Sequence, residues 1–179
     1  MSNLKLKTLI KEEYYNLMEV ENSLSQDDLT EILEGYLEAA LWTEEDNLKS
    51  QMGDDSNMYN DDEEGESDID KLIRLTSEFQ RKPIMNFIVD NIDPDSKIQA
   101  YMDIKTFITF AGRDAIVEAI EENGLGKLGH DIWLTRNGHG AGFFDHSYEF
   151  EKNLMDAAHK LKSVDLYITD DYKLVFSNA

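Results

Sequence analysis

The stretch from residue 134 to residue 145, LTRNGHGAGFFD, constrains the fold more than any other part of the chain, because glycine occurs at positions 138, 140 and 142. Glycine loses more conformational freedom on folding than other residues, so such a run indicates special backbone geometry rather than core filling. An Asn-Gly pair between apolar residues is also a strong signal for a short hairpin. We therefore expect a β-hairpin over residues 131–145, with its turn at Asn137 and Gly138.

The residues after this block predict a helix and a second hairpin. Apolar residues recur at helical spacing between 148 and 161, and they alternate with other residues from 164 to 168. Asp170 and Asp171 would turn the chain, which returns over 173–176. Residues 129–179 are thus expected to form a hairpin–helix–hairpin module, in which one helix covers a small antiparallel sheet. This arrangement belongs to the α+β class.

The preceding residues, 1–128, are expected to be mainly helical and to pack with this module as one unit. Apolar residues recur every three or four positions, which is the helical period. Ser25 followed by Asp28 is a capping-box-like start, Asp93-Pro94 is a second start, and Asn123-Gly124 is typical of a helix end. The expected helical segments are 3–20, 26–46, 67–83, 84–89 and 94–123, with an interruption possible at Gly112.

Acidic residues dominate the charge of the chain, which has a formal net charge of -21 and a sequence pI near 4.3. Residues 50–67 show no apolar periodicity, and the stretch 54–70 contains nine acidic residues and neither Lys nor Arg. Such a segment buries little, so we interpret it as an acidic loop. It is either a solvated linker or a polyanionic arm for a basic groove, with calcium binding as a minor option. The carboxylates proposed to contact a partner are Asp54, Asp55, Asp61, Asp62, Glu63, Glu64, Glu66 and Asp68.

Composition also limits the compartment and the partners. The chain contains no cysteine, no apolar run long enough to cross a membrane and no apolar signal segment near Met1. We therefore expect a cytoplasmic protein without membrane contact. A strongly anionic surface repels phosphate backbones and favours basic protein surfaces. The expected partner is a nucleic-acid-binding protein or nuclease rather than nucleic acid, and no cofactor or metal is predicted.

Three sequence motifs resemble those of a widespread family of small, uncharacterised proteins of tailed phages and prophages. Residues 129–145 match a family segment that usually contains HDFWLTRNGHGAGFWD. Residues 35–42, GYLEAALW, match an upstream GYIEAALW element, and residues 164–175 match a closing VDLYVGDDGKLY. Phe144 replaces the usual Trp of the first motif, Tyr172 replaces a turn glycine of the last, and the helices between 68 and 124 are longer than the usual insert.

The resemblance implies a phage origin, and with it a host-cell cytoplasmic location. Small acidic phage proteins often antagonise host defences, including CRISPR nucleases and restriction enzymes. By this analogy, we expect a non-enzymatic inhibitor that acts as a nucleic-acid mimic. The family itself implies no defined activity.

The expected hairpin offers two polar clusters as alternative sites. At its tip, Arg136, Asn137 and His139 could capture a small ligand such as a nucleotide signal. Alternatively, the glycines are structural and another segment lies across Gly140 and Gly142, with Trp42 as a plausible cover. Both Trp42 and Trp133 are otherwise expected in the core.

The other cluster lies at the open end of the expected hairpin. Its members are His130, Asp131, Asp145 and His146. Two imidazoles and two carboxylates could hold a metal or a general base of a hydrolase. Since the chain has neither the HExxH spacing nor a thiolate, surface or hydrogen-bonding roles are favoured for these side chains.

Overall fold

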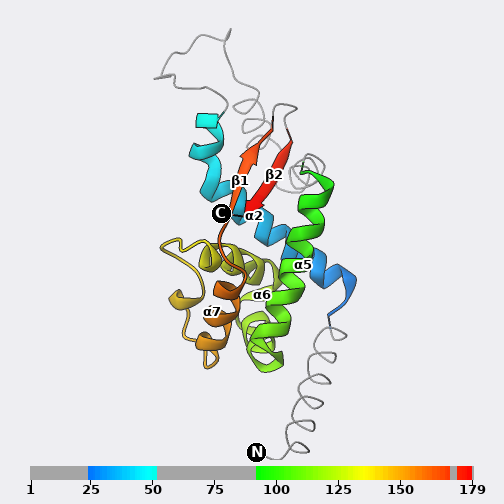
Figure 1. Ribbon diagram of the computed structural model, residues 1–179. Coiled ribbons are helices and arrows are strands. Elements are labelled where there is room, and N and C mark those ends of the chain that lie inside the picture. The colour runs from blue at the N-terminus through cyan, green and yellow to red at the C-terminus, as the bar shows by residue number, and fades with distance from the viewer. Residues whose placement is uncertain (1–23, 52–91, 170–172, 179) are drawn as a thin grey trace, which may run out of the picture.

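Helices α2 (Gln26–Gln51) and α6 (Arg113–Arg136) form the centre of the fold, because glycines let their backbones approach closely. A Cβ atom on Gly35 would lie 1.9 Å from the carbonyl oxygen of Gly126, and one on Gly129 would lie 1.9 Å from that of Ile32. Neither position can hold a larger residue without movement of a helix. The computed structural model describes residues 24–51, 92–169 and 173–178 (Figure 1).

The remaining elements surround this helix pair (Figure 1). They are α5 (Pro94–Ala111), the short 3₁₀ helix η1 (Phe143–Asp145), α7 (Glu151–Lys160), β1 (Val164–Ile168) and β2 (Leu174–Asn178). Helices α5, α6 and α7 pack against one another, while α2 contacts β1. The α+β class and the helical region before the small sheet are therefore confirmed.

Three of the expected helix boundaries are confirmed by hydrogen bonds or backbone angles. Ser25 Oγ accepts from the backbone N–H of Asp28, and the Asp28 carboxylate accepts from the backbone N–H of Ser25. Asp93 caps α5 by accepting from the N–H groups of residues 95 and 96. Gly124 has φ of 82° and ψ of 169°, so it divides α6 where the Asn-Gly pair predicted a helix end.

The hairpin expected over 131–145 is wrong, because residues 125–136 continue α6 as a helix. Asn137 is the C-cap of this helix, and Gly138 adopts a positive φ of 70°. The N–H of Gly138 donates to the carbonyl of Thr135, and that of His139 donates to the carbonyl of Leu134. This pair of hydrogen bonds is a Schellman motif, which satisfies the last carbonyls of a helix. The Asn-Gly pair therefore ends a helix instead of joining two strands.

The second hairpin is confirmed, with a register that pairs residues 164 and 178 at one end and 168 and 174 at the other. Ile92 adds a parallel bridge to Leu174, and the N–H of Asp93 donates to the Leu174 carbonyl at 2.9 Å. The module expected over 129–179 consequently consists of a helix end, a loop with η1, one helix and one hairpin. Its expected boundary at residues 128 and 129 falls inside α6.

A single hydrophobic cluster joins the described helices and the sheet. Trp133 is fully buried, and its indole Nε1 donates to Thr43 Oγ1 at 2.8 Å. Tyr36 meets Trp133 edge-on, and Phe107 stacks on Phe143. The prediction that Trp133 lies in the core is confirmed, whereas that for Trp42 is wrong, since its side chain is 63% exposed.

Several expectations fall on residues outside the described part of the chain. These are the helical segments 3–20, 67–83 and 84–89, the turn at Asp170 and Asp171, and the acidic stretch 54–70. Helix α2 extends to Gln51, beyond its expected end at residue 46. Among the described helices, none combines the length and the apolar character needed to cross a bilayer.

Candidate functional site

The glycine-rich block forms a loop that is held by its own hydrogen bonds, and most of its polar side chains are hydrogen-bonded within the fold. Gly142 adopts a φ of 140°, and a Cβ atom there would lie 2.4 Å from Thr135 Oγ1. Thr135 Oγ1 also accepts from the N–H of Phe143, while Asp145 accepts from the N–H of Gly142. Thr135 therefore covers Gly142. The expectation that Trp42 covers this segment is wrong, because Thr135 is the nearest residue to a Cβ atom on Gly142. A Cβ atom on Gly140 would lie in open space.

Arg136 is a buried structural residue and not an exposed recognition group. Its side chain is 1% exposed and donates to Asp103 at 2.8 Å and to the hydroxyl of Tyr36 at 2.5 Å. Two further hydrogen bonds reach the carbonyls of Leu161 and Lys162. All these donors are directed into the protein, so the geometry gives no support to ligand capture by this guanidinium.

Asn137 and His139 do not form a ligand site with Arg136. The side-chain oxygen of Asn137 accepts from the N–H of Val164 at 2.9 Å, and its amide nitrogen donates to the carbonyl of Trp133. His139 is partly buried, and its Nε2 atom has no hydrogen-bond partner among the described residues. Asn137 thus links the end of α6 to the start of β1.

The second predicted cluster is brought together only in part. His146 Nε2 lies 3.0 Å from Oδ2 of the fully buried Asp131, although neither atom is aligned for a hydrogen bond. Lys127 Nζ lies 2.7 Å from the other oxygen of Asp131. By contrast, His130 stacks on Trp42, and Asp145 caps η1. The four side chains therefore do not form one site, and no group of ligands suited to a metal occurs among the residues that the structure describes.

Tyr148 extends the pair of Asp131 and His146 toward the first half of α6. Its hydroxyl accepts from the side-chain amide of Asn123 at 2.7 Å, and its ring lies 5.0 Å from that of His146. Burial, with the negative charge of Asp131, raises the pKa of Tyr148 to about 12, although the hydrogen bond from Asn123 opposes the shift. The phenol therefore stays neutral near neutral pH. The contacts of Tyr148 with Asn123 and His146 hold the loop before α7 against α6.

An acidic stripe on α2 is the surface that sequence reasoning missed. It consists of Asp27, Glu31, Glu34 and Glu38, which are all exposed. Their spacing of four, three and four residues places them on one helix face, over about 16 Å at 1.5 Å per residue. Leu29, Ile32, Tyr36 and Leu37 are buried on other faces of the same helix. The spacing of these acids opposite the apolar residues was the signal that could have identified the stripe.

The carboxylates of the acidic stripe have no basic partner within the described residues. The ion pairs found there involve Asp103, Asp131 and Asp156, none of which lies on α2. Among the described residues, no cation neutralises the charge of the stripe. Within the described part of the chain, a basic partner would not have to displace an internal ion pair to reach these groups.

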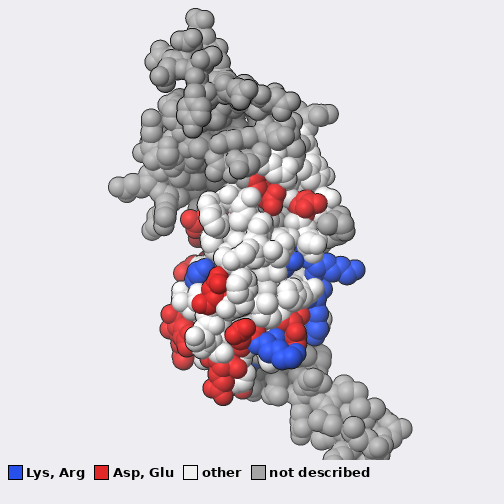
Figure 2. Space-filling view, turned by 90° about the vertical axis from the view of Figure 1, so that its left-hand side faces the viewer, with Lys and Arg blue, Asp and Glu red and all other residues white. Residues whose placement is uncertain are grey.

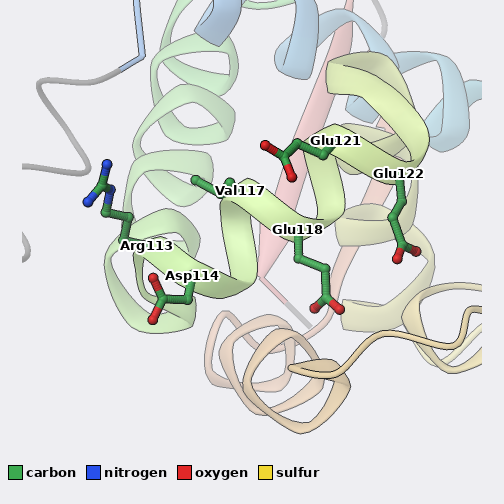
Figure 3. A pocket seen from close by; sticks show the side chains of 6 residues that line it. All are labelled: Arg113, Asp114, Val117, Glu118, Glu121 and Glu122. Atoms are coloured by element: carbon green, nitrogen blue, oxygen red, sulfur yellow. The ribbon is translucent and has the colours of Figure 1, made fainter.

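A second acidic surface lies on the first half of α6. Asp114, Glu118, Glu121 and Glu122 line an open depression of about 470 Å³, together with Arg113 and Val117 (Figure 3). Glu118 is already engaged, because its carboxylate accepts from the N–H groups of Glu149 and Phe150 ahead of α7. In Figure 2, Asp and Glu side chains are most frequent at the left and lower left of the described part, and others lie at its upper right and beside the Lys and Arg side chains at the lower right.

Trp42 ends the acidic stripe, one helical turn after Glu38. Its ring stacks on that of His130, with centroids 5.9 Å apart and an interplanar angle of 26°. Burial, followed by the nearby positive charge of Lys127, lowers the pKa of His130 below its ordinary value of 6.5, although Asp131 and Glu38 oppose this shift. The stack therefore pairs an indole with a neutral imidazole near neutral pH.

Acidification should weaken the fold through His130. Because its pKa is lowered in the folded state, the unfolded chain binds this proton at a higher pH than the folded chain does. The contribution of His130 is intact above its ordinary pKa of 6.5 and declines as the pH falls toward its folded pKa. In melting experiments between about pH 7 and about pH 5, His130→Gln should show a smaller loss of stability than the parent chain. The exposed His159→Gln is the control, and equal losses in all three proteins would contradict the assignment.

Comparisons with protein-family models, with curated proteins and with solved structures found no match to this chain.

Proposed function

We propose that this chain is a phage-encoded, non-enzymatic inhibitor that binds the basic nucleic-acid groove of a host defence nuclease of the CRISPR or restriction type. The observation that carries this proposal is the acidic stripe on α2, whose four carboxylates are exposed without a basic partner in the described residues. A row of carboxylates on a rigid helix presents negative charge at regular intervals, as a phosphate backbone does.

Three further observations support the proposal. The net charge of -21 lies well beyond the magnitude of about 2–8 that suffices for the solubility of a small domain. The sequence motifs resemble those of a phage protein family. Arg136, Asn137 and Asp145, which belong to the two alternative sites, are hydrogen-bonded inside the fold, and this favours the inhibitor over ligand capture or hydrolysis.

The proposal predicts capture of a nuclease from a lysate of the bacterial host. The intact protein should retain a nucleic-acid-binding enzyme at low salt and lose it at moderate salt, because exposed charges are screened. A triple variant, Glu31→Gln, Glu34→Gln and Glu38→Gln, should bind the captured enzyme roughly tenfold more weakly, at about 0.2–1 kcal/mol per exposed ion pair.

The matched control removes the same charge from α6 through Asp114→Asn, Glu121→Gln and Glu122→Gln. If both triple variants weaken binding equally, the effect reflects total charge and not the stripe. A deletion of residues 54–70, which lie outside the described residues, measures how much this acidic stretch contributes to binding of the captured enzyme. Capture of no nucleic-acid-binding protein, or capture unaffected by salt, would overturn the proposed function.

A further inference from the structure

Trp42 is the most exposed of the large apolar side chains in the described residues, at 63%. One face of its ring is occupied by His130, so the exposed area comes from the opposite face and the ring edges. The adjacent Thr43 accepts from buried Trp133 and so anchors this turn of α2 on α6. The stack on His130 restrains the indole, which reduces the side-chain freedom lost when a partner covers the open face.

The charges around the open face of Trp42 select the chemistry of that partner. Glu38 lies one turn earlier on the same side of α2, and side chains four residues apart on a helix are neighbours. Glu34 continues the negative charge away from the indole. A flat cation therefore meets both an aromatic face and a carboxylate at this end of the acidic stripe.

We propose that Trp42 and Glu38 together form a seat for an arginine side chain of the partner, whose guanidinium stacks on the indole while it pairs with the carboxylate. The guanidinium is planar and weakly hydrated, and its donors fit a carboxylate in a fork geometry. The ammonium of lysine is compact and strongly hydrated, so it gains less from stacking. Trp is the strongest of the aromatic partners for such a cation. The biological partner of this seat, an arginine in a nucleic-acid groove, rests on the proposed function.

Hexa-arginine and hexalysine peptides test the seat directly, since they carry equal charge. The intact protein should bind hexa-arginine about threefold more tightly than hexalysine, as exposed cation–π contacts predict. The indole N–H resonance of Trp42 should shift on titration with hexa-arginine, whereas that of buried Trp133 should not. Trp42→Leu should abolish the preference for arginine, because it should weaken hexa-arginine binding more than hexalysine binding.

Phe144→Leu is the matched control, because Phe144 is also an exposed aromatic residue, at 45%, but lies in η1. This variant should retain the preference for arginine. Equal binding of the two peptides by the intact protein, or an unchanged Trp42 resonance at saturation, would overturn the seat. If the peptides behave as expected and no nuclease is captured, the proposed function fails alone. If a nuclease is captured but Trp42→Leu leaves both its binding and the peptide preference unchanged, the seat fails alone.

Discussion

Gly129→Ala should destabilise the folded chain by about 3 kcal/mol, at the upper end of the usual range for overpacking. The added Cβ atom would lie 1.9 Å from the carbonyl oxygen of Ile32 and 2.7 Å from the backbone nitrogen of Tyr36. Both atoms belong to the backbone of α2, so relief requires α2 and α6 to separate. Urea denaturation of the variant and the parent chain gives the difference in the free energy of unfolding.

Gly126→Ala is the control on the same helix. No atom lies within 4 Å of a Cβ atom built on Gly126, and the residue lies in the helical part of α6. Alanine is favoured over glycine in a helix interior by about 1 kcal/mol, so this variant should be as stable as the parent chain or more stable. Equal destabilisation by the two substitutions would show that the close helix contact is not what requires Gly129.

Arg136→Leu should destabilise the chain by about 3–5 kcal/mol, because it leaves buried groups without their donor. The substitution removes hydrogen bonds to Tyr36, to Asp103 and to two backbone carbonyls. The loss should be apparent as a lower midpoint in chemical denaturation. A stability close to that of the parent chain would mean that water replaces the guanidinium without penalty.

Two further variants separate burial from charge at this position. Arg113→Leu removes the same charge from an exposed position at the start of α6 and should change the unfolding free energy by about 0.5 kcal/mol or less. Asp103→Asn combined with Arg136→Leu should destabilise less than the sum of the two single changes, because the second change removes the carboxylate that the first leaves unpaired. Additive effects would argue against direct coupling of the two side chains.

Local sequence patterns correctly predicted those helix starts and strands for which a pattern is compatible with only one structure. Ser25 and Asp93 start helices because their side chains accept from the N–H groups of the first turn. Alternation from Val164 to Ile168 correctly predicted a strand. The Asn137-Gly138 pair was misread because a positive φ at glycine suits both a hairpin turn and a helix C-cap. The choice between them depended on packing of residues 128–136 against α2, which no local pattern encodes.

The candidate site was harder to predict than the fold. Arg136 lies in a polar, glycine-rich segment, which favoured a solvent-exposed role, yet its acceptors come from residues 36, 103, 161 and 162. Asp131 and His146 were placed near each other for the wrong reason, since a helix and a loop bring them together. The acidic stripe could have been predicted from its spacing, but Trp42 could not be recognised as exposed before its neighbours on α6 were known.

The large sequence separation between Arg136 and its hydrogen-bond partners also affects the order in which the chain can fold during synthesis. Its partners extend from Tyr36, 100 residues earlier, to Lys162, 26 residues later. Contacts between such distant residues form late, because long loops must close first. While the ribosome is still adding residues before 161, the guanidinium lacks two of its acceptors. The helices can form as they emerge, but this network is completed only after residue 162 has been made.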